Sequence, residues 1–190
     1  LVDGDVQWSF NELKNQIYKS AKAFIETGIK VGDRIGIWAP NSWEWVIAAL
    51  GVHVAGGVLV PINTRFKGKE ASYVLTKANV KLLFTVTDFL ETNYVALLQG
   101  TEAVIQLKEI IVLRGNSDEK TIPFDEFLKR GSGRKDEEVQ DRSKQISGDD
   151  LCHIMFTSGT TGAPKGAMLK HSAVVRGYND WADIIGLQKQ

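Results

Sequence analysis

Ten consecutive residues in the last quarter of the chain carry side chains and backbone suited to binding phosphate groups. Segment 157–166 reads Thr-Ser-Gly-Thr-Thr-Gly-Ala-Pro-Lys-Gly, with three glycines, four hydroxyl residues and one lysine. Glycine lets backbone amides approach an anion closely. The hydroxyl groups donate hydrogen bonds, and Lys165 supplies a mobile positive charge. These residue types within ten positions predict a loop that binds nucleotide phosphates.

This segment differs from the most familiar phosphate-binding loop, G-x-x-x-x-G-K-[ST]. Counted from Gly159, that pattern needs glycine at Pro164 and a hydroxyl residue at Gly166. A helix also follows that loop directly, whereas the residues after Gly166 form an apolar run typical of a strand. We therefore expect the segment to be the tip of a β-hairpin whose strands are 151–156 and 167–169.

Upstream, short apolar runs alternate with amphipathic segments. The expected strands are 34–39, 58–62, 81–86 and 109–113. The expected helices are 9–27, 41–55, 67–78, 93–98 and 103–107, with another at 172–185. Ser9 and Glu12 have the spacing of a capping box, and Asn41 with Glu44 is expected to cap the second helix. This alternation predicts an α/β fold, with a mainly parallel sheet flanked by helices and the hairpin loop added to it.

Residues 131–150 differ from the rest in composition, because they contain almost no apolar side chains. Such a stretch predicts a solvated polar linker. The expected organisation is therefore an α/β subdomain at 1–130, the linker at 131–150, and residues 151–190 as the start of the next part of the same large domain.

Composition and charge exclude several classes of function. The chain is 43% hydrophobic and 24% charged, as is typical of soluble globular proteins. Its 23 basic and 23 acidic residues produce no net field that would attract nucleic acid. No apolar run approaches the roughly 18–20 residues that cross a bilayer, so no transmembrane segment is predicted. The single cysteine, Cys152, excludes an internal disulfide and favours a reducing compartment, the cytoplasm.

The chain's histidines and Cys152 are the other residues with chemical potential. His53 is expected to pack in the core, and His153 to occupy a position in the sheet. Because Cys152 and His153 are neighbours on a strand, they should point to opposite faces and cannot form a nucleophile–base pair. One cysteine and three scattered histidines lack the spacing of metal ligands, so no metal site is predicted among them. His171 is expected at the start of the last helix, with direct catalysis as the alternative.

Segment 157–166, with its flanks 154–156 and 169–171, resembles the signature of the adenylate-forming (AMP-binding) superfamily. That group contains the acyl- and aryl-CoA synthetases, the adenylation domains of peptide synthetases, and the luciferases. Segments 8–13, 31–35, 40–42, 56–63 and 149–151 also resemble family elements, in the family's order. Residues 61–66 are most similar to the fatty-acyl and related carboxylate–CoA ligases.

The resemblance implies a reaction in two steps. A carboxylate attacks the α-phosphate of ATP to give an acyl adenylate and pyrophosphate, and the thiol of coenzyme A then displaces AMP. Lys165 and Thr161 are the implied catalytic residues, Thr161 is the implied contact of Mg²⁺, and His171 is implied to support the loop indirectly. The implied phosphate-binding residues are Thr157, Ser158, Gly159, Thr160, Thr161, Gly162 and Lys165. The implied substrate is a fatty or other hydrophobic carboxylic acid.

Several alternatives stay open. An aryl-CoA ligase, a fatty acyl-AMP ligase or an adenylation domain would share the first step, whereas a nucleotide-binding module would lack catalysis. A P-loop NTPase is disfavoured by Pro164 and Gly166. By resemblance, the chain is expected to be an N-terminal fragment, about a third of a family member and inactive alone. Uncovered apolar surface is expected to favour a homo-oligomer.

Overall fold

The computed structural model describes residues 1–102, 104–157 and 163–187. Within them, seven strands form one sheet in the order β7-β6-β5-β3-β4-β8-β9, and β1 pairs with β2 in a separate ribbon. The strands are β1 Val2–Asp3, β2 Val6–Gln7, β3 Arg34–Trp38, β4 Val58–Pro61, β5 Val80–Val86, β6 Glu109–Arg114, β7 Ile122–Pro123, β8 Leu151–Thr157 and β9 Lys165–Lys170. The helices are α1 Phe10–Glu26, α2 Trp43–Val54, α3 Gly68–Lys77, α4 Tyr94–Gln99, α5 Phe124–Lys129, the 3-10 helix η1 Arg130–Gly133, α6 Asp136–Lys144 and α7 His171–Ile184.

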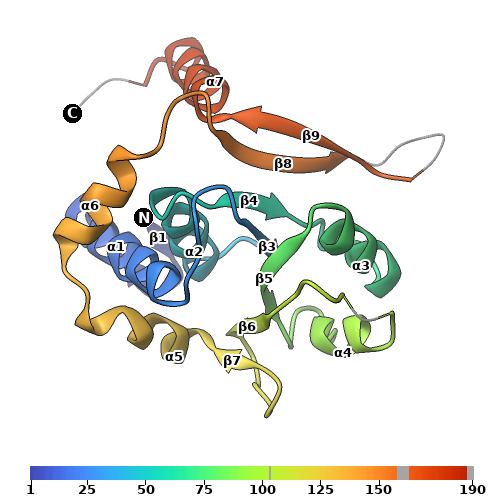
Figure 1. Ribbon diagram of the computed structural model, residues 1–190. Coiled ribbons are helices and arrows are strands. Elements are labelled where there is room, and N and C mark those ends of the chain that lie inside the picture. Colours follow the sequence, from blue (N-terminus) through green and yellow to red (C-terminus); the bar gives the residue numbers. More distant parts are fainter. Residues whose placement is uncertain (103, 158–162, 188–190) are drawn as a thin grey trace.

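The large sheet is parallel from β7 to β8, and only the β8–β9 pair is antiparallel. Helices α1, α2 and α5 cover one face, with α6 packed on α1 and α2, and α3 and α4 cover the other face (Figure 1). Parallel strands covered on both faces are apolar throughout, and the central strands β3, β4 and β5 are almost completely buried. The predicted α/β fold with a mainly parallel sheet is confirmed.

An aromatic cluster joins the first helix layer to the sheet. Phe24 of α1, Phe84 of β5 and Phe127 of α5 are fully buried, and their ring centroids lie 5.0–5.3 Å apart. Tilted and edge-to-face pairs of this kind are worth about 0.5–1.5 kcal/mol beyond the area they bury. The cluster therefore fixes α1 and α5 on the sheet.

Local sequence signals explain where the helices begin. The amide of Glu12 donates to Ser9 Oγ at 3.3 Å and the amide of Ser9 donates to Glu12 Oε2 at 2.8 Å, which is the predicted capping box of α1. The cap of α2 is Ser42 rather than the predicted Asn41, because Ser42 Oγ accepts the amide of Trp45 at 3.2 Å. Asn41 stands one residue too early for that bond.

The helix predicted at 103–107 is not found among the described residues 104–107, which form a turn. A single backbone hydrogen bond, from the amide of Leu107 to the carbonyl of Val104 at 3.0 Å, closes this turn. The segment then enters β6 at Glu109. One turn closed by a single hydrogen bond is not extended into a helix here.

Residues 131–150 differ from the solvated linker that the sequence predicts, because they contain part of η1 and all of α6. Val139, the one apolar residue of α6, is fully buried. Arg142 Nη1 donates to the carbonyl oxygens of Ile29 at 2.9 Å and Ala55 at 3.2 Å. Carbonyl groups near helix ends need such donors, so a polar helix can dock through hydrogen bonds rather than apolar area. The division of the chain at this segment stays a prediction.

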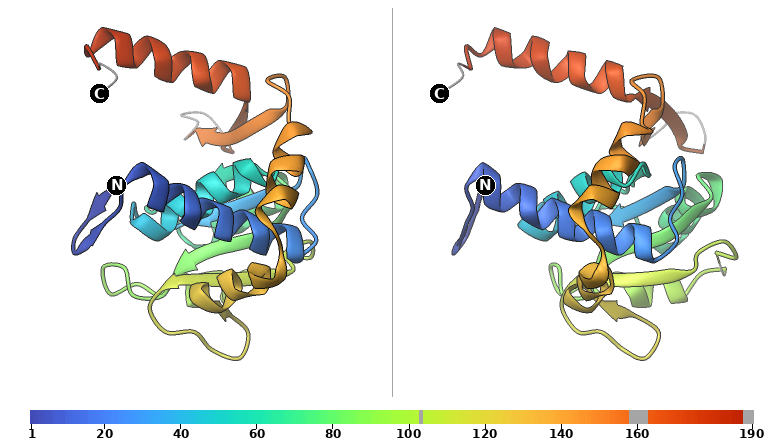
Figure 2. Two further views of the ribbon diagram at one scale, coloured as in Figure 1. Left: turned by 90° about the vertical axis from the view of Figure 1, so that its left-hand side faces the viewer. Right: turned by 60° about the vertical axis from the view of Figure 1, so that its left-hand side comes forward.

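We call the β8–β9 hairpin and α7 the arm. Residues 151–170 join the sheet through β4, where Leu59 pairs with His153. Helix α7 packs on β8 and β9 and extends away from the α/β unit (Figure 2). Its apolar residues Tyr178, Trp181 and Ile185 are all exposed, and no described side chain of α7 is fully buried. No helix within the described residues is both long and apolar enough to span a membrane.

The substitution Arg142→Ala tests the docking of α6. It removes a charged donor from two carbonyl groups, so we expect the free energy of unfolding to fall by about 1.5–3 kcal/mol, measured by urea denaturation. Lys144→Ala, on the same helix, removes only the exposed ion pair with Asp141. That control should change stability by less than about 0.5 kcal/mol. Equal effects of the two substitutions would contradict this account.

Candidate nucleotide-phosphate site

The β8–β9 hairpin carries the predicted phosphate loop at its open end. The strands pair antiparallel, with Phe156 opposite Gly166 and Thr157 opposite Lys165 as the last pair before the loop. The hairpin predicted from the sequence is therefore confirmed, and its second strand begins at Lys165, two residues before the predicted start. Because directly opposed residues share a face of the sheet, the side chains of Thr157 and Lys165 leave the hairpin on the same side.

Both side chains of this last pair are exposed. Thr157 Oγ1 donates to the carbonyl oxygen of Lys165 at 3.5 Å, which holds the hydroxyl over the hairpin end. Lys165 extends from the first position of β9. A hydroxyl and an ammonium group side by side at a loop entrance can contact one anionic group together.

The other predicted site residues fall into two groups. Ser158, Gly159, Thr160, Thr161 and Gly162 lie outside the described residues, so their roles, including that of Thr161 toward Mg²⁺, stay predictions. His171 is the first residue of α7, at the opposite end of β9 from Lys165. Its predicted supporting role toward the loop also stays a prediction.

Gly166 has a packing role that the sequence does not reveal. A Cβ atom at this position would lie 2.9 Å from Ile154 Cγ2 and 3.2 Å from Phe156 Cζ. Both of those side chains pack against the main core. A larger residue at 166 would have to displace these two side chains of β8, so glycine at this position favours their packing against the core.

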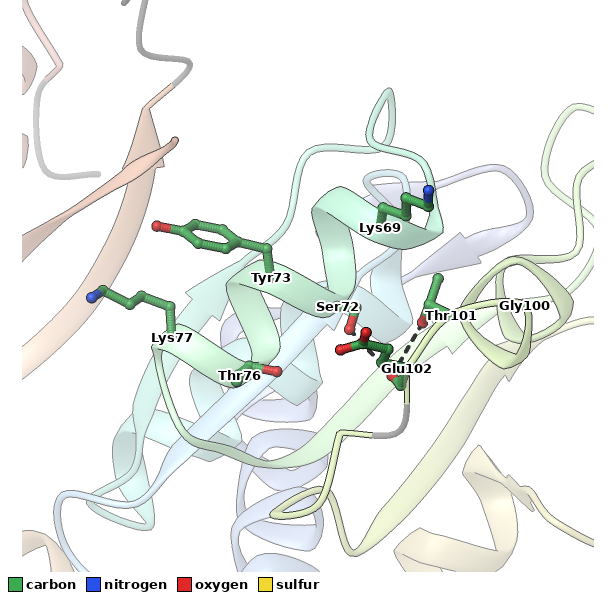
Figure 3. A pocket seen from close by; sticks show the side chains of 8 residues that line it. All are labelled: Lys69, Ser72, Tyr73, Thr76, Lys77, Gly100, Thr101 and Glu102. Carbon is green, nitrogen blue, oxygen red and sulfur yellow. Dashed lines mark hydrogen bonds between the residues drawn. The ribbon is translucent and has the colours of Figure 1, made fainter. Parts of the chain in front are cut away.

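A hydrogen bond from a residue of α3 also contacts the end of the loop, at Pro164. The Tyr73 hydroxyl donates to the carbonyl oxygen of Pro164 at 3.2 Å, immediately before Lys165. Figure 3 shows Tyr73 and Lys77 directed toward the hairpin, away from Ser72 and Glu102. Tyr73 and Lys77 also line an open cavity of about 640 Å³ between α3 and the segment after α4. Tyr73 and Pro164 are 91 positions apart, and no local pattern predicts their contact.

The base of the hairpin brings together the residues that the sequence suggests are scattered. His53 of α2 lies with Nδ1 3.8 Å from Cys152 Sγ and with Nε2 3.0 Å from His153 Nε2. The ring of His171 packs edge-on to that of His53, with centroids 5.6 Å apart. The expectation that Cys152 and His153 point apart is wrong, because the β8–β9 register shifts between Leu151 and His153 and both side chains reach His53.

Burial governs the protonation of this cluster. It lowers the pKa of His53 to about 3, with further lowering by the positive charges that His153 and His171 would carry. Burial also lowers the pKa of His153 and of His171, although Asp150 opposes the shift at His171. It raises the pKa of the Cys152 thiol. At neutral pH His53 is therefore an uncharged imidazole beside a protonated thiol.

A family model and several curated proteins match this chain. The family model described as "AMP-binding enzyme" matches residues 1–189. A 3-[(3aS,4S,7aS)-7a-methyl-1,5-dioxo-octahydro-1H-inden-4-yl]propanoyl:CoA ligase from Rhodococcus jostii (strain RHA1) is 34% identical over 187 residues, covering 96% of this chain and 36% of that protein. The human mitochondrial medium-chain acyl-CoA ligase ACSF2 is 32% identical over 189 residues, covering 92% of this chain and 31% of that protein.

Among solved structures, ATP-bound MatB from Rhodopseudomonas palustris superposes with a TM-score of 0.72 at 26% identity, covering 92% of this chain and 32% of that one. The chain thus spans about a third of the length of the curated relatives it matches. With a family match over nearly all of its residues, the chain belongs to the AMP-binding enzyme family.

Proposed function

We propose that the protein to which this chain belongs is an acyl-CoA synthetase. It would convert a fatty or other hydrophobic carboxylic acid, ATP and coenzyme A into acyl-CoA, AMP and pyrophosphate through an acyl adenylate. The observation that carries the proposal is the exposed pair of Thr157 and Lys165 at the end of the hairpin. Family membership and the two CoA ligases among the relatives support it.

The first half-reaction explains why such a pair is needed. When the carboxylate attacks the α-phosphate, negative charge builds on the oxygen that leaves with pyrophosphate. A cation and hydrogen-bond donors placed where that charge develops stabilise the transition state more than the ground state. Lys165 would supply the charge, and the Thr157 hydroxyl would turn from the Lys165 carbonyl to donate to a phosphate oxygen.

The ion that accompanies ATP, Mg²⁺, is part of the proposal, as are coenzyme A and the acid as substrates. Bound Mg²⁺ would neutralise part of the triphosphate charge. Its predicted contact Thr161 lies outside the described residues, and the roles proposed for Thr157 and Lys165 do not depend on it. A cytoplasmic or other reducing location is proposed because Cys152 is the only cysteine in the sequence.

The Tyr73 hydrogen bond would fix how Lys165 approaches ATP. Pro164 stands directly before Lys165, so the bond to its carbonyl sets the direction in which the lysine leaves the loop. Positioning of this kind matters because small misplacements of a charged group weaken its interaction with the developing charge. We therefore assign Tyr73 as a positioning residue.

We expect Lys165→Ala to lower the rate of adenylation at least tenfold, about 1.4 kcal/mol or more in activation free energy. The substitution is made in a polypeptide that contains this chain and has the full length of its relatives. The measurement is acid-dependent release of pyrophosphate from ATP. Lys170→Ala is the matched control, since Lys170 lies on the same strand and pairs with the exposed Asp149 at 2.9 Å. An unchanged rate of pyrophosphate release in Lys165→Ala would contradict the role proposed for this lysine.

Tyr73→Phe keeps the ring packing and removes only the hydrogen bond to Pro164. We expect kcat for adenylation to fall about two- to tenfold, as the loss of one hydrogen bond predicts, with the melting temperature nearly unchanged. Tyr18→Phe on α1, far from the loop, should leave kcat unaffected. A fall in stability with no change in kcat would show that Tyr73 has only a structural role.

The 190-residue chain by itself should bind ATP no more tightly than about 1 mM, equivalent to about −4 kcal/mol. It spans about a third of its relatives, so few contacts remain to offset the cost of association. Isothermal titration calorimetry checks this, with the longer polypeptide as the reference. Binding tighter than about 0.1 mM, or formation of acyl adenylate by the chain alone, would overturn the expectation.

A further inference from the structure

Three elements meet where the arm joins the sheet, and each brings a metal-binding side chain. His53 comes from α2, Cys152 from β8 and His171 from the first turn of α7. One ligand atom from each residue lies within 4.8 Å of the others. Cys152 is buried, and both histidines are partly buried.

The donor set has a definite chemical preference. Two imidazole nitrogens and one sulfur suit a borderline divalent ion such as Zn²⁺ or Co²⁺, and do not suit Mg²⁺ or Ca²⁺. With metal–nitrogen bonds of about 2.0 Å and a metal–sulfur bond of about 2.3 Å, tetrahedral ligand atoms lie about 3.3–3.6 Å apart. The 3.8 Å between Cys152 Sγ and His53 Nδ1 is close to this spacing. A ligand nitrogen of His171 lies within 4.8 Å of both atoms, so a movement of about 1 Å would bring it to tetrahedral spacing.

We propose that His53, Cys152 and His171 form a binding site for a divalent transition-metal ion of the zinc type, with the fourth coordination position open. Three protein ligands with one open position are typical of zinc sites that bind a further molecule or water. This site is separate from the Mg²⁺ contact predicted at Thr161, because it lies at the base of the hairpin and not at its tip.

His153 serves as the partner that orients His53. Its Nε2 lies 3.0 Å from His53 Nε2, so the two rings share one hydrogen bond. A metal-binding imidazole commonly uses its second nitrogen in this way, which fixes the ring and its tautomer. When His53 Nε2 carries the proton and donates it to His153, the lone pair of His53 Nδ1 is directed toward Cys152 and the metal.

Binding also balances the charges of the site. The uncharged imidazole of His53 is already in the form that binds a metal. The thiol of Cys152 must lose its proton to solvent, and burial opposes this until the cation arrives. A metal thiolate carries less net charge than the free ion, which suits a partly buried place. The bound ion would link α2, β8 and α7 directly, beside the Leu59–His153 pair that joins β4 to β8.

Co²⁺ titration of the 190-residue chain under reducing conditions tests the proposal and needs no ATP. We expect the intense visible absorption of tetrahedral Co²⁺, a thiolate-to-cobalt charge-transfer band in the near ultraviolet, and loss of both on addition of Zn²⁺. Cys152→Ser should abolish the charge-transfer band, and His171→Asn should weaken Zn²⁺ binding at least tenfold. The control Ser172→Ala, on an exposed neighbour of His171, should behave as the unsubstituted chain. Saturating Zn²⁺ should raise the melting temperature by about 5 °C.

A weak, octahedral Co²⁺ spectrum in the unsubstituted chain would overturn the proposal, as would equal Zn²⁺ affinity in all three variants. If Cys152→Ser does not fold, ¹¹³Cd NMR of the unsubstituted chain decides the matter without any substitution. A cadmium resonance in the range of mixed sulfur and nitrogen ligands supports the site, and one in the range of oxygen ligands excludes it. Neither result depends on whether the protein activates carboxylic acids.

Discussion

The candidate site depends on the short parallel junction between β4 and β8. There the hairpin joins the sheet at the pairing of Leu59 with His153, and from there it projects toward the open end that carries Thr157 and Lys165. A hairpin held only by backbone pairing is marginally stable in water. Here Ile154 and Phe156 also pack against the core, and Gly166 leaves room for them. The position of the open end that carries Thr157 and Lys165 is thus set by the β4–β8 pairing at the base and by side-chain packing along the hairpin.

Charge is distributed along this hairpin in a way that suits an anionic ligand. Lys165 stands at the open end, whereas Lys170 at the other end of β9 is paired with Asp149. The histidines at the base have pKa values lowered by burial, and His53 is uncharged at neutral pH. A chain with no net charge can therefore still offer a local positive group where the loop begins.

Much of the fold is predictable from the sequence because its signals are local. The capping box at Ser9 acts over three residues, and strands buried on both faces are apolar throughout. The features that sequence reasoning missed depend on contacts between residues far apart in the chain. Arg142 docks α6 by donating to carbonyl groups 87 and 113 positions away. Likewise, only a register shift in β8, invisible in the sequence, brings both Cys152 and His153 to His53.

The candidate phosphate loop shows the same difference between local signals and long-range contacts. Its glycines, hydroxyls and lysine can be read from ten consecutive residues, and the hairpin could be predicted from the apolar runs on either side. The contact of Tyr73 with Pro164 could not, because it joins α3 to a loop 91 positions later. The local sequence thus predicts which chemical groups the candidate site contains, whereas tertiary contacts determine how those groups are oriented.

The central claim is that Lys165 lies against the phosphates of ATP, and chemical labelling tests it most directly. An acyl phosphate of ATP transfers its acyl group to the lysine amine nearest the bound phosphates, and peptide mass spectrometry identifies that lysine. With the longer polypeptide and saturating probe, the account predicts labelling of Lys165 that excess ATP suppresses. Labelling concentrated on Lys77 or Lys170, or equal on all exposed lysines with no protection by ATP, would contradict it.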